Sequence, residues 1–189
     1  ARKVLFLGYG PDRNRLIPAL IEKGCEVWHG TENIKISKEF DLVMSFGYRS
    51  LISKSAIAEV AAPIINLHIS YLPYNRGAHP NYWSFVEGTP SGVSIHLIDV
   101  GIDTGPVLYQ ELVQFGSEDR TFAQTHEKLI DSVQDLFLKH ADEILSKSYV
   151  PHAQSGKGTF HRLSDLPKDF PGWDTPIVDE LARRGVKRG

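Results

Sequence analysis

Short apolar runs alternate with helical repeats through residues 1–70. The apolar runs predict strands at Val4–Leu7, Cys25–His29, Asp41–Phe46 and Pro63–Ile69. After the first strand, apolar residues recur at helical spacing and predict a helix: Leu16, Ile17, Leu20 and Ile21. Pro18 favours a late start or a bend in that helix, and Ser53 is expected to cap a second helix over residues 53–62. Strands that alternate with helices are typical of an α/β, Rossmann-like fold, a mostly parallel sheet with helices on its faces.

The regular pattern is lost between Tyr71 and Ser91, where prolines and glycines are mixed with aromatic and basic side chains. A connection of this length within a compact domain is usually functional or disordered. Its aromatic content argues against disorder. Residues 81–86 are expected to form a helical turn or two.

The second half of the pattern begins with a hairpin, predicted from strands at Gly92–Asp99 and Val107–Val113 around a glycine-rich turn. Thr121 and Gln124 match a capping box, and the apolar stripe that follows predicts a helix to about Lys147. From residue 151 the chain is rich in glycine, proline and charge, with one short strand candidate at 159–161. We predict one domain over residues 1–150 and an extended C-terminal tail over residues 151–189.

Composition and charge narrow the class of protein. The 189 residues, 41% hydrophobic and 23% charged, suit a single globular domain. Cys25 is the one cysteine, which excludes an internal disulfide and favours a reducing compartment. The net charge of −2 predicts no broad attraction to nucleic acid or to an anionic membrane, and no apolar run approaches the ~18–20 residues that cross a bilayer. We expect a cytoplasmic enzyme or binding protein.

Three polar side chains share one face at the end of the strand predicted over residues 63–69. Asn66, His68 and Ser70 alternate with apolar residues. Such polar groups are costly in a core unless they have partners, and ligands of open α/β sheets bind beyond the carboxyl ends of strands. The three residues therefore either form a functional site or fasten the following loop by hydrogen bonds.

Other candidates have a structural alternative beside the functional one. Asp99 and Asp103 flank a glycine-rich turn and can serve turn geometry or catalysis. Arg76 can bind an anion or lie in solvent. Gly8 and Gly10 follow the first strand like a dinucleotide fingerprint, but the third glycine is missing. No metal-ligand spacing and no serine or cysteine nucleophile motif is present, so we expect no metal.

Two motifs resemble those of the N10-formyltetrahydrofolate-dependent formyltransferases. They are NLHISYLPYNRGAHP at residues 66–80 and GVSIHLIDVGIDTGP at residues 92–106. The family includes glycinamide ribonucleotide transformylase, the catalytic domain of methionyl-tRNA formyltransferase and the sugar N-formyltransferases. The resemblance is specific from about Asp41 to Gln110, and it implies that residues 1–150 are the catalytic domain, with the family's fold and a shortened N-terminal half.

The resemblance implies a catalytic triad of Asn66, His68 and Asp103. It also implies that a formyl group passes from N10-formyltetrahydrofolate to a primary amine through a tetrahedral oxyanion. Asn66 is expected to donate an N–H to that oxygen, a donor worth about 2.7–4 kcal/mol in comparable sites. His68 stabilises the same charge or passes a proton, and Asp103 favours the imidazolium and can accept the amine's proton.

The same resemblance implies two sets of binding residues. Those for the folate are Tyr48, Arg49, Leu51, Asp99 and Val100, in the SFGYRSLI stretch (residues 45–52) and in the turn that closes over it. Those for the acceptor are Ser70, Arg76 and His79.

Departures from the family favour the sugar N-formyltransferases. The phosphate-binding Gly-Ser-Asn loop of the glycinamide ribonucleotide enzymes is absent after the first strand, where Gly8–Pro11 stands. We expect no counterpart of the C-terminal domain with which methionyl-tRNA formyltransferases hold tRNA, because the 189 residues are too few for it. The stretches Phe46–Ile52 and Thr159–Arg162 resemble the sugar enzymes, so we expect the acceptor amine to lie on a nucleotide-linked sugar.

Three alternatives stay open. Glycinamide ribonucleotide formylation is disfavoured by the missing loop. A folate- or nucleotide-binding module without turnover is favoured by the short N-terminal half, and an oxidoreductase only by Gly8 and Gly10. For any of them we expect small-molecule partners, no nucleic acid and no membrane, and a homodimer stays open.

Overall fold

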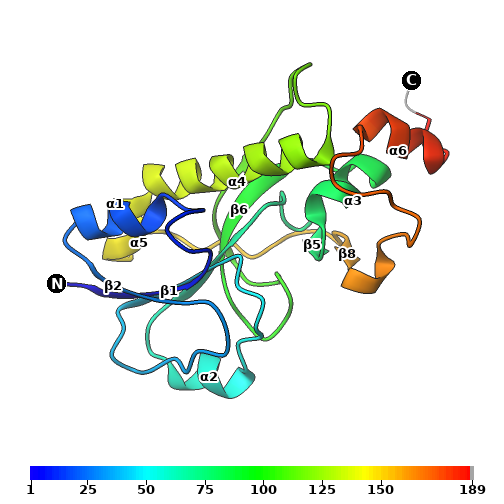
Figure 1. Cartoon of the computed structure of the whole chain (residues 1–189). Helices are drawn as coiled ribbons and strands as arrows, with labels where there is room; N and C mark the ends of the chain where they lie inside the picture. Colours follow the sequence, from blue (N-terminus) through cyan, green and yellow to red (C-terminus); the bar gives the residue numbers. More distant parts are fainter. Residues whose placement is uncertain (188–189) are drawn as a thin grey trace.

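The computed structural model describes residues 1–187 and contains one six-stranded sheet in the order β2-β1-β3-β4-β6-β7 (Figure 1). Its strands are β1 (Lys3–Gly8), β2 (Glu26–Gly30), β3 (Leu42–Phe46), β4 (Ile64–His68), β6 (Gly92–Leu97) and β7 (Val107–Leu112). The pairs among the first four are parallel, whereas β6 runs antiparallel to both β4 and β7. The predicted α/β fold with a mostly parallel sheet is confirmed, and β6 and β7 form the predicted hairpin.

Helices cover both faces of the sheet. One face carries α1 (Leu16–Glu22), α4 (Phe122–Lys139) and α5 (Ala141–Ser146), and the other carries α2 (Lys54–Glu59) (Figure 1). Successive side chains of a strand point to opposite faces. Val4 and Phe6 therefore pack into the larger core beneath α1 and α4, while Leu5 and Leu7 belong to the smaller core on the α2 side.

Local sequence signals set the starts of these helices. Ser53 caps α2 by accepting a hydrogen bond from the Ala56 N–H at 3.1 Å. Thr121 and Gln124 form the predicted capping box of α4. Pro18 falls in the first turn of α1, where the missing N–H has no intrahelical partner to lose, so the helix begins at Leu16 and not later.

The helix predicted to continue to Lys147 is interrupted at His140, so that prediction was wrong in this detail. α4 ends at Lys139 and α5 begins at Ala141, with His140 between them at φ −114°. The His140 ring stacks on Tyr109 at a centroid distance of 3.8 Å. That contact is between distant parts of the chain, and a helical spacing cannot reveal it.

The irregular segment and the C-terminal tail pack against each other. β5 (Arg76–Gly77) pairs in parallel with β8 (Phe160–His161), and α3 (Pro80–Glu87) contacts α6 (Ile177–Arg183). The Tyr82 hydroxyl donates to the fully buried carboxylate of Glu180 at 2.7 Å. The tail thus contains a helix, a short strand and the 3-10 turn η1 (Leu163–Asp165) and is not simply extended. The domain boundary at residue 150 stays a prediction.

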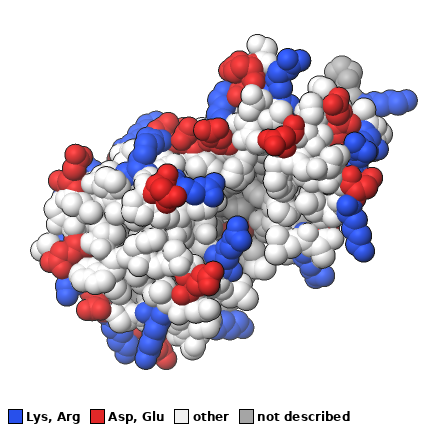
Figure 2. Space-filling model, viewed as in Figure 1, with Lys and Arg blue, Asp and Glu red and all other residues white. Residues whose placement is uncertain are grey.

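The surface carries charges of both signs. Figure 2 shows acidic and basic side chains interspersed over the viewed face, which has a recess near its centre. The chain has 21 Lys and Arg residues against 23 Asp and Glu residues, so neither sign dominates. Within residues 1–187, no helix has the length and apolar character needed to span a bilayer.

Candidate active site

A cavity of about 1050 Å³, here called the first cavity, opens beyond the carboxyl ends of β1, β3 and β4. Its lining includes Tyr9 after β1, Phe46–Arg49 around the end of β3, and Asn66–Ile69 at the end of β4. The tail closes another side with residues 160–164. This is the position at which open α/β sheets bind their ligands.

Two neighbouring strands turn polar side chains to the same face at this edge. Asn66 of β4 lies opposite His96 of β6, and His68 lies opposite Ser94. The residues between them, such as Leu67 and Ile95, point into the larger core. The strand alternation therefore places four polar side chains on one face of the sheet, and two of them, Asn66 and His68, line the first cavity.

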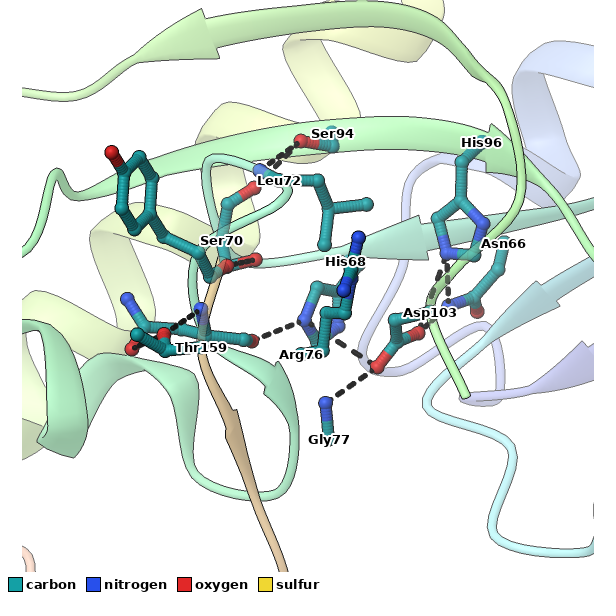
Figure 3. A network of polar contacts seen from close by, with 12 residues as sticks. Asn66, His68, Ser70, Leu72, Arg76, Gly77, Ser94, His96, Asp103 and Thr159 are labelled. Carbon is teal, nitrogen blue, oxygen red and sulfur yellow. Dashed lines mark hydrogen bonds and ion pairs between the residues drawn. The ribbon is translucent and has the colours of Figure 1, made fainter. Parts of the chain in front are cut away.

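Asp103 joins Asn66, His68 and His96 to form what we call the polar cluster (Figure 3). The Asn66 Nδ2 donates to Asp103 Oδ1 at 3.2 Å, and the Gly77 N–H donates to Asp103 Oδ2 at 2.8 Å. His68 Nε2 lies 3.6 Å from Oδ2, and His96 Nε2 lies 3.3 Å from Oδ1. The structure thus brings together the three side chains expected to form the triad.

The surroundings of Asp103 favour its charged form. Burial raises the pKa of the carboxyl, but the His68 charge, the hydrogen bond and charge of His96, and the Gly77 N–H outweigh burial and hold the pKa well below its ordinary value. Only 12% of the side chain is exposed, so solvent screens these interactions weakly. Asp103 is therefore an anion at neutral pH. It is suited to orient and stabilise a neighbouring cation and not to carry a proton itself.

The tautomer of His68 follows from its hydrogen bond. Nε2 lies 2.8 Å from the carbonyl oxygen of Asn75. A carbonyl can only accept, so Nε2 carries hydrogen, and Nδ1 is the nitrogen that gains or loses a proton. The buried Asn75 is held in turn, because its N–H donates to Thr159 Oγ1 at 2.7 Å and its amide donates to Thr89 at 2.8 Å.

His96 is a member of the cluster that the sequence analysis missed. It is 2% exposed, its Nδ1 donates to the Leu97 carbonyl at 2.9 Å, and its Nε2 lies 3.2 Å from the Asn66 amide nitrogen. The sequence signal was its place on a hairpin strand, two residues after Ser94 and on the same face. His96 contacts Asn66 only because β6 pairs with β4 in the antiparallel register that places the two residues opposite each other.

Three of the predicted binding residues line the first cavity: Tyr48, Arg49 and His79. His79 stands immediately before α3 with φ +51°, and Tyr48 accepts a hydrogen bond from the Ile34 N–H at 3.2 Å. The backbone around Gly47 adopts φ +71°, a region that favours glycine.

The other five predicted binding residues do not line it. Leu51 and Val100 are 90% and 70% exposed and point to solvent. Asp99 serves its turn by accepting hydrogen bonds from Gly101 and Thr104. The Ser70 hydroxyl is buried and donates to the Tyr74 carbonyl at 2.8 Å, and Arg76 is bound to Gln154. Their predicted contacts with ligands stay predictions.

A second cavity of about 780 Å³ adjoins the first. The two share Tyr9, Arg49, Ile69, His79, Pro80 and Ile130. The second is further lined by Arg13, whose guanidinium lies over the Tyr9 ring at 4.8 Å, by His126 and by Trp173. Burial and the neighbouring charges of Arg13 and His79 lower the pKa of His126. Among residues 1–187, no group of three or more His, Cys, Asp or Glu residues could hold a metal ion.

Comparison with known proteins places this geometry in a family. The formyl transferase family model matches residues 31–139, which is more than half of the chain. The chain belongs to the formyl transferase family. The match covers β3, β4, the hairpin and α4, and therefore all members of the polar cluster. The predicted family membership is confirmed.

Relatives of two kinds resemble this formyl transferase. Methionyl-tRNA formyltransferase of Clostridium botulinum is 33% identical over 77% of this chain and 46% of its own length. The dTDP-4-amino-4,6-dideoxyglucose formyltransferase of Mycobacterium bovis is 32% identical over 72% of this chain and 55% of its own. The chain thus spans about half the length of these curated relatives.

A solved structure matches over nearly the whole of both chains. It is the formyltransferase PseJ from Anoxybacillus kamchatkensis, in complex with UDP-4,6-dideoxy-4-formamido-L-AltNAc and tetrahydrofolate. The two chains are 36% identical, the match covers 95% of this chain and 97% of the other, and the TM-score is 0.86.

Proposed function

We propose that this formyl transferase moves a formyl group from N10-formyltetrahydrofolate to a primary amine on a nucleotide-linked sugar. The observation that carries the proposal is the meeting of Asn66, His68 and Asp103 in the lining of the first cavity, which adjoins the second. A two-substrate transfer needs one pocket for each substrate and polar groups where they meet. The likeness to PseJ, whose complex holds tetrahydrofolate and a formamido sugar nucleotide, supports this pair of substrates.

The first cavity suits the folate donor. Folate is flat and largely aromatic, and this cavity offers apolar and aromatic surface from Ile102, Phe160 and Leu163. The Tyr48–Arg49 backbone follows a glycine and can approach a ring edge closely. When bound there, the folate supplies the formyl carbon next to the polar cluster.

The second cavity suits the acceptor. A nucleotide-linked sugar combines an aromatic base with a diphosphate, and this cavity combines the Trp173 indole with the Arg13 and Arg49 guanidinium groups. Because His79 and Arg49 line both cavities, the sugar amine can reach the polar cluster from this side.

The polar cluster divides the chemistry among its members. The new C–N bond forms as the bond between the formyl carbon and folate N10 breaks, and the amine proton ends on N10. Asn66 donates one N–H to Asp103, and its amide has a second N–H that can turn to the formyl oxygen. His68 moves the proton at Nδ1, and the Asp103 anion 3.6 Å away stabilises its imidazolium.

The assay that tests this function supplies the folate donor with a panel of UDP- and dTDP-linked 4-amino and 3-amino sugars. Release of tetrahydrofolate that depends on one of these sugars supports the proposal. If only glycinamide ribonucleotide supports turnover, the acceptor is not a nucleotide-linked sugar, and glycinamide ribonucleotide takes its place in the proposal. Folate binding without transfer to any amine would favour the binding-module alternative.

We expect Arg13→Ala to raise KM for the nucleotide sugar by roughly ten- to a hundred-fold, the effect of losing a hydrogen bond to a charged group. KM for the folate donor should change little, since Arg13 lines only the second cavity. Arg15→Ala is the matched control, because Arg15 binds Asp135 on the outer surface and lines neither cavity. Steady-state kinetics with each substrate varied will check this. An equal rise in KM for the folate would contradict the assignment of the cavities.

The predictions about partners and place in the cell rest on surface character. We propose that the chain binds no nucleic acid, because its charges are mixed in sign over the face seen in Figure 2 and no basic stripe crosses that face. A homodimer and a cytoplasmic location stay predictions, and sedimentation analysis at several concentrations tests the first.

A further inference from the structure

Gln154 lies in the C-terminal tail, outside the residues that the family model matches, yet its side chain joins two loops of the site. Its Oε1 accepts hydrogen bonds from Arg76 Nε at 3.0 Å and Arg76 Nη2 at 2.7 Å. Its Nε2 donates to the carbonyl oxygens of Asp103 and Gly105, both at 2.8 Å. A guanidinium only donates and a carbonyl only accepts, so the amide can be oriented in one way only, and it uses all its hydrogen-bonding capacity.

The backbone at Asp103 needs this support. Asp103 has φ +55°, a left-handed conformation that a residue with a Cβ adopts at a cost. Two residues later the chain passes so close to β6 that a Cβ on Gly105 would overlap the Leu97 carbonyl oxygen. Gln154 donates a hydrogen bond to each of the two carbonyls of this turn. The conformation of the turn sets the direction in which the Asp103 carboxylate points.

The other half of the same amide supports the carboxylate itself. Gln154 fixes Arg76, and the N–H of the next residue, Gly77, donates to Asp103 Oδ2 at 2.8 Å. A closed ring of contacts therefore runs from Gln154 through Arg76 and Gly77 to Asp103 and back (Figure 3 shows the Gly77–Asp103 link). Neither Gln154 nor Arg76 is among the residues that line the two cavities.

The segment that carries Gln154 is itself fixed. His152 and Val107 exchange two backbone hydrogen bonds of 2.8 Å, which ties the segment to β7. Five residues after Gln154, the Thr159 hydroxyl oxygen accepts a hydrogen bond from the Asn75 N–H. The Asn75 carbonyl oxygen in turn accepts the hydrogen bond from His68 Nε2. The tail thus contacts the supports of both His68 and Asp103.

We propose that Gln154 is a positioning residue that holds Asp103 in its catalytic geometry. Gln154 would then contribute to turnover without contacting a substrate. The proposal rests on the formyl transfer proposed above, and the experiment separates the two: absence of turnover by the wild-type protein counts against the function, whereas wild-type turnover that Gln154 does not influence counts against the positioning role alone.

The test is the kinetics of Gln154→Ala, Gln154→Glu and Gln114→Ala. We expect Gln154→Ala to lower kcat roughly ten- to a hundred-fold, the effect of a displacement of about 1 Å at a reacting group, with both KM values nearly unchanged. Gln154→Glu can still bind Arg76 but cannot donate to the two carbonyls, so it should lose a similar factor. The exposed Gln114 is the matched control and should leave kcat unchanged.

A double-variant cycle separates positioning from a general structural role. If Gln154 acts through Asp103, adding Gln154→Ala to Asp103→Asn should lower kcat no further than Asp103→Asn alone. Urea unfolding of each variant shows whether any loss follows stability instead. Wild-type kcat in Gln154→Ala, a further drop in the double variant, or a loss confined to KM would each overturn the proposal.

Discussion

Asp103→Asn is expected to lower kcat by about 10²–10⁴-fold, the range for removal of a group that assists proton transfer. Asparagine has nearly the same shape and can still accept the Gly77 N–H, so the turn should survive. The lost element is the negative charge 3.6 Å from His68 Nε2, which stabilises the imidazolium as the proton moves. Single-turnover assays with saturating folate and acceptor measure the effect on chemistry.

The control for this variant is Asp142→Asn. Asp142 pairs with Lys23 on the surface, and its side chain is 87% exposed. Exposed pairs contribute little, so kcat and stability should both stay near the wild-type values. An Asp103→Asn enzyme that keeps its kcat would remove the carboxylate from the mechanism.

The contribution of Asp103 to the free energy of unfolding should also depend on pH, and the depressed pKa fixes the sign of this dependence. The folded-state pKa of Asp103 is depressed, so its carboxylate contributes stability above the unfolded value of about 3.9, and this contribution is lost as pH falls through the folded pKa. Asparagine does not titrate. The difference in unfolding free energy between wild type and Asp103→Asn should therefore be constant at neutral pH and shrink below about pH 4.

Much of the fold follows from local signals that the sequence carries. The apolar runs locate the strands of the main sheet, and the capping box locates the start of α4. Asn66 and His68 could be found because a period of two at the end of a buried strand places both on one face. The turn alone left the role of Asp103 open between turn geometry and catalysis, and only the resemblance of residues 92–106 to the family's motif implied a catalytic role.

Contacts between distant segments could not be found in this way. His96 becomes part of the cluster through a register with β4 that neither strand specifies alone. Gln154 lies 51 residues from Asp103, in a segment with no periodic pattern. Arg76 shows the same limit: its place in the loop favours a ligand contact, and the sequence does not reveal that its guanidinium also binds the Gln154 amide of the tail.

The two cavities give a physical reason for the length of the irregular segment. Residues 71–91 must leave β4, supply the Asn75 carbonyl and the Gly77 N–H to the cluster, and then place His79 between the cavities before α3 begins. These tasks require backbone N–H and carbonyl groups that are free to bind the side chains of the cluster. In regular helices and strands most of these groups are already hydrogen-bonded to one another. Between β4 and α3 the chain forms only turns and the two-residue strand β5, so it can perform all of these tasks.

His68→Ala and His68→Gln are both expected to lower kcat by about 10²–10⁴-fold. Alanine removes the ring and leaves the buried Asn75 carbonyl without its partner, so part of its loss can come from a displaced loop. Glutamine can still donate an N–H to that carbonyl but has no group that gains a proton near neutral pH. A large loss in His68→Gln therefore reports the proton transfer itself.

The matched control for these variants is His140→Gln, since His140 lies at the junction of α4 and α5 and lines neither cavity. Its kcat should equal that of the wild type. Because His68 and Asp103 act as a unit, the double variant His68→Gln with Asp103→Asn should be little slower than the slower single variant. A rate close to wild type in His68→Gln would mean that His68 only holds the loop, and the proton would then have to travel through another group of the cluster, of which His96 is the one with a titratable ring.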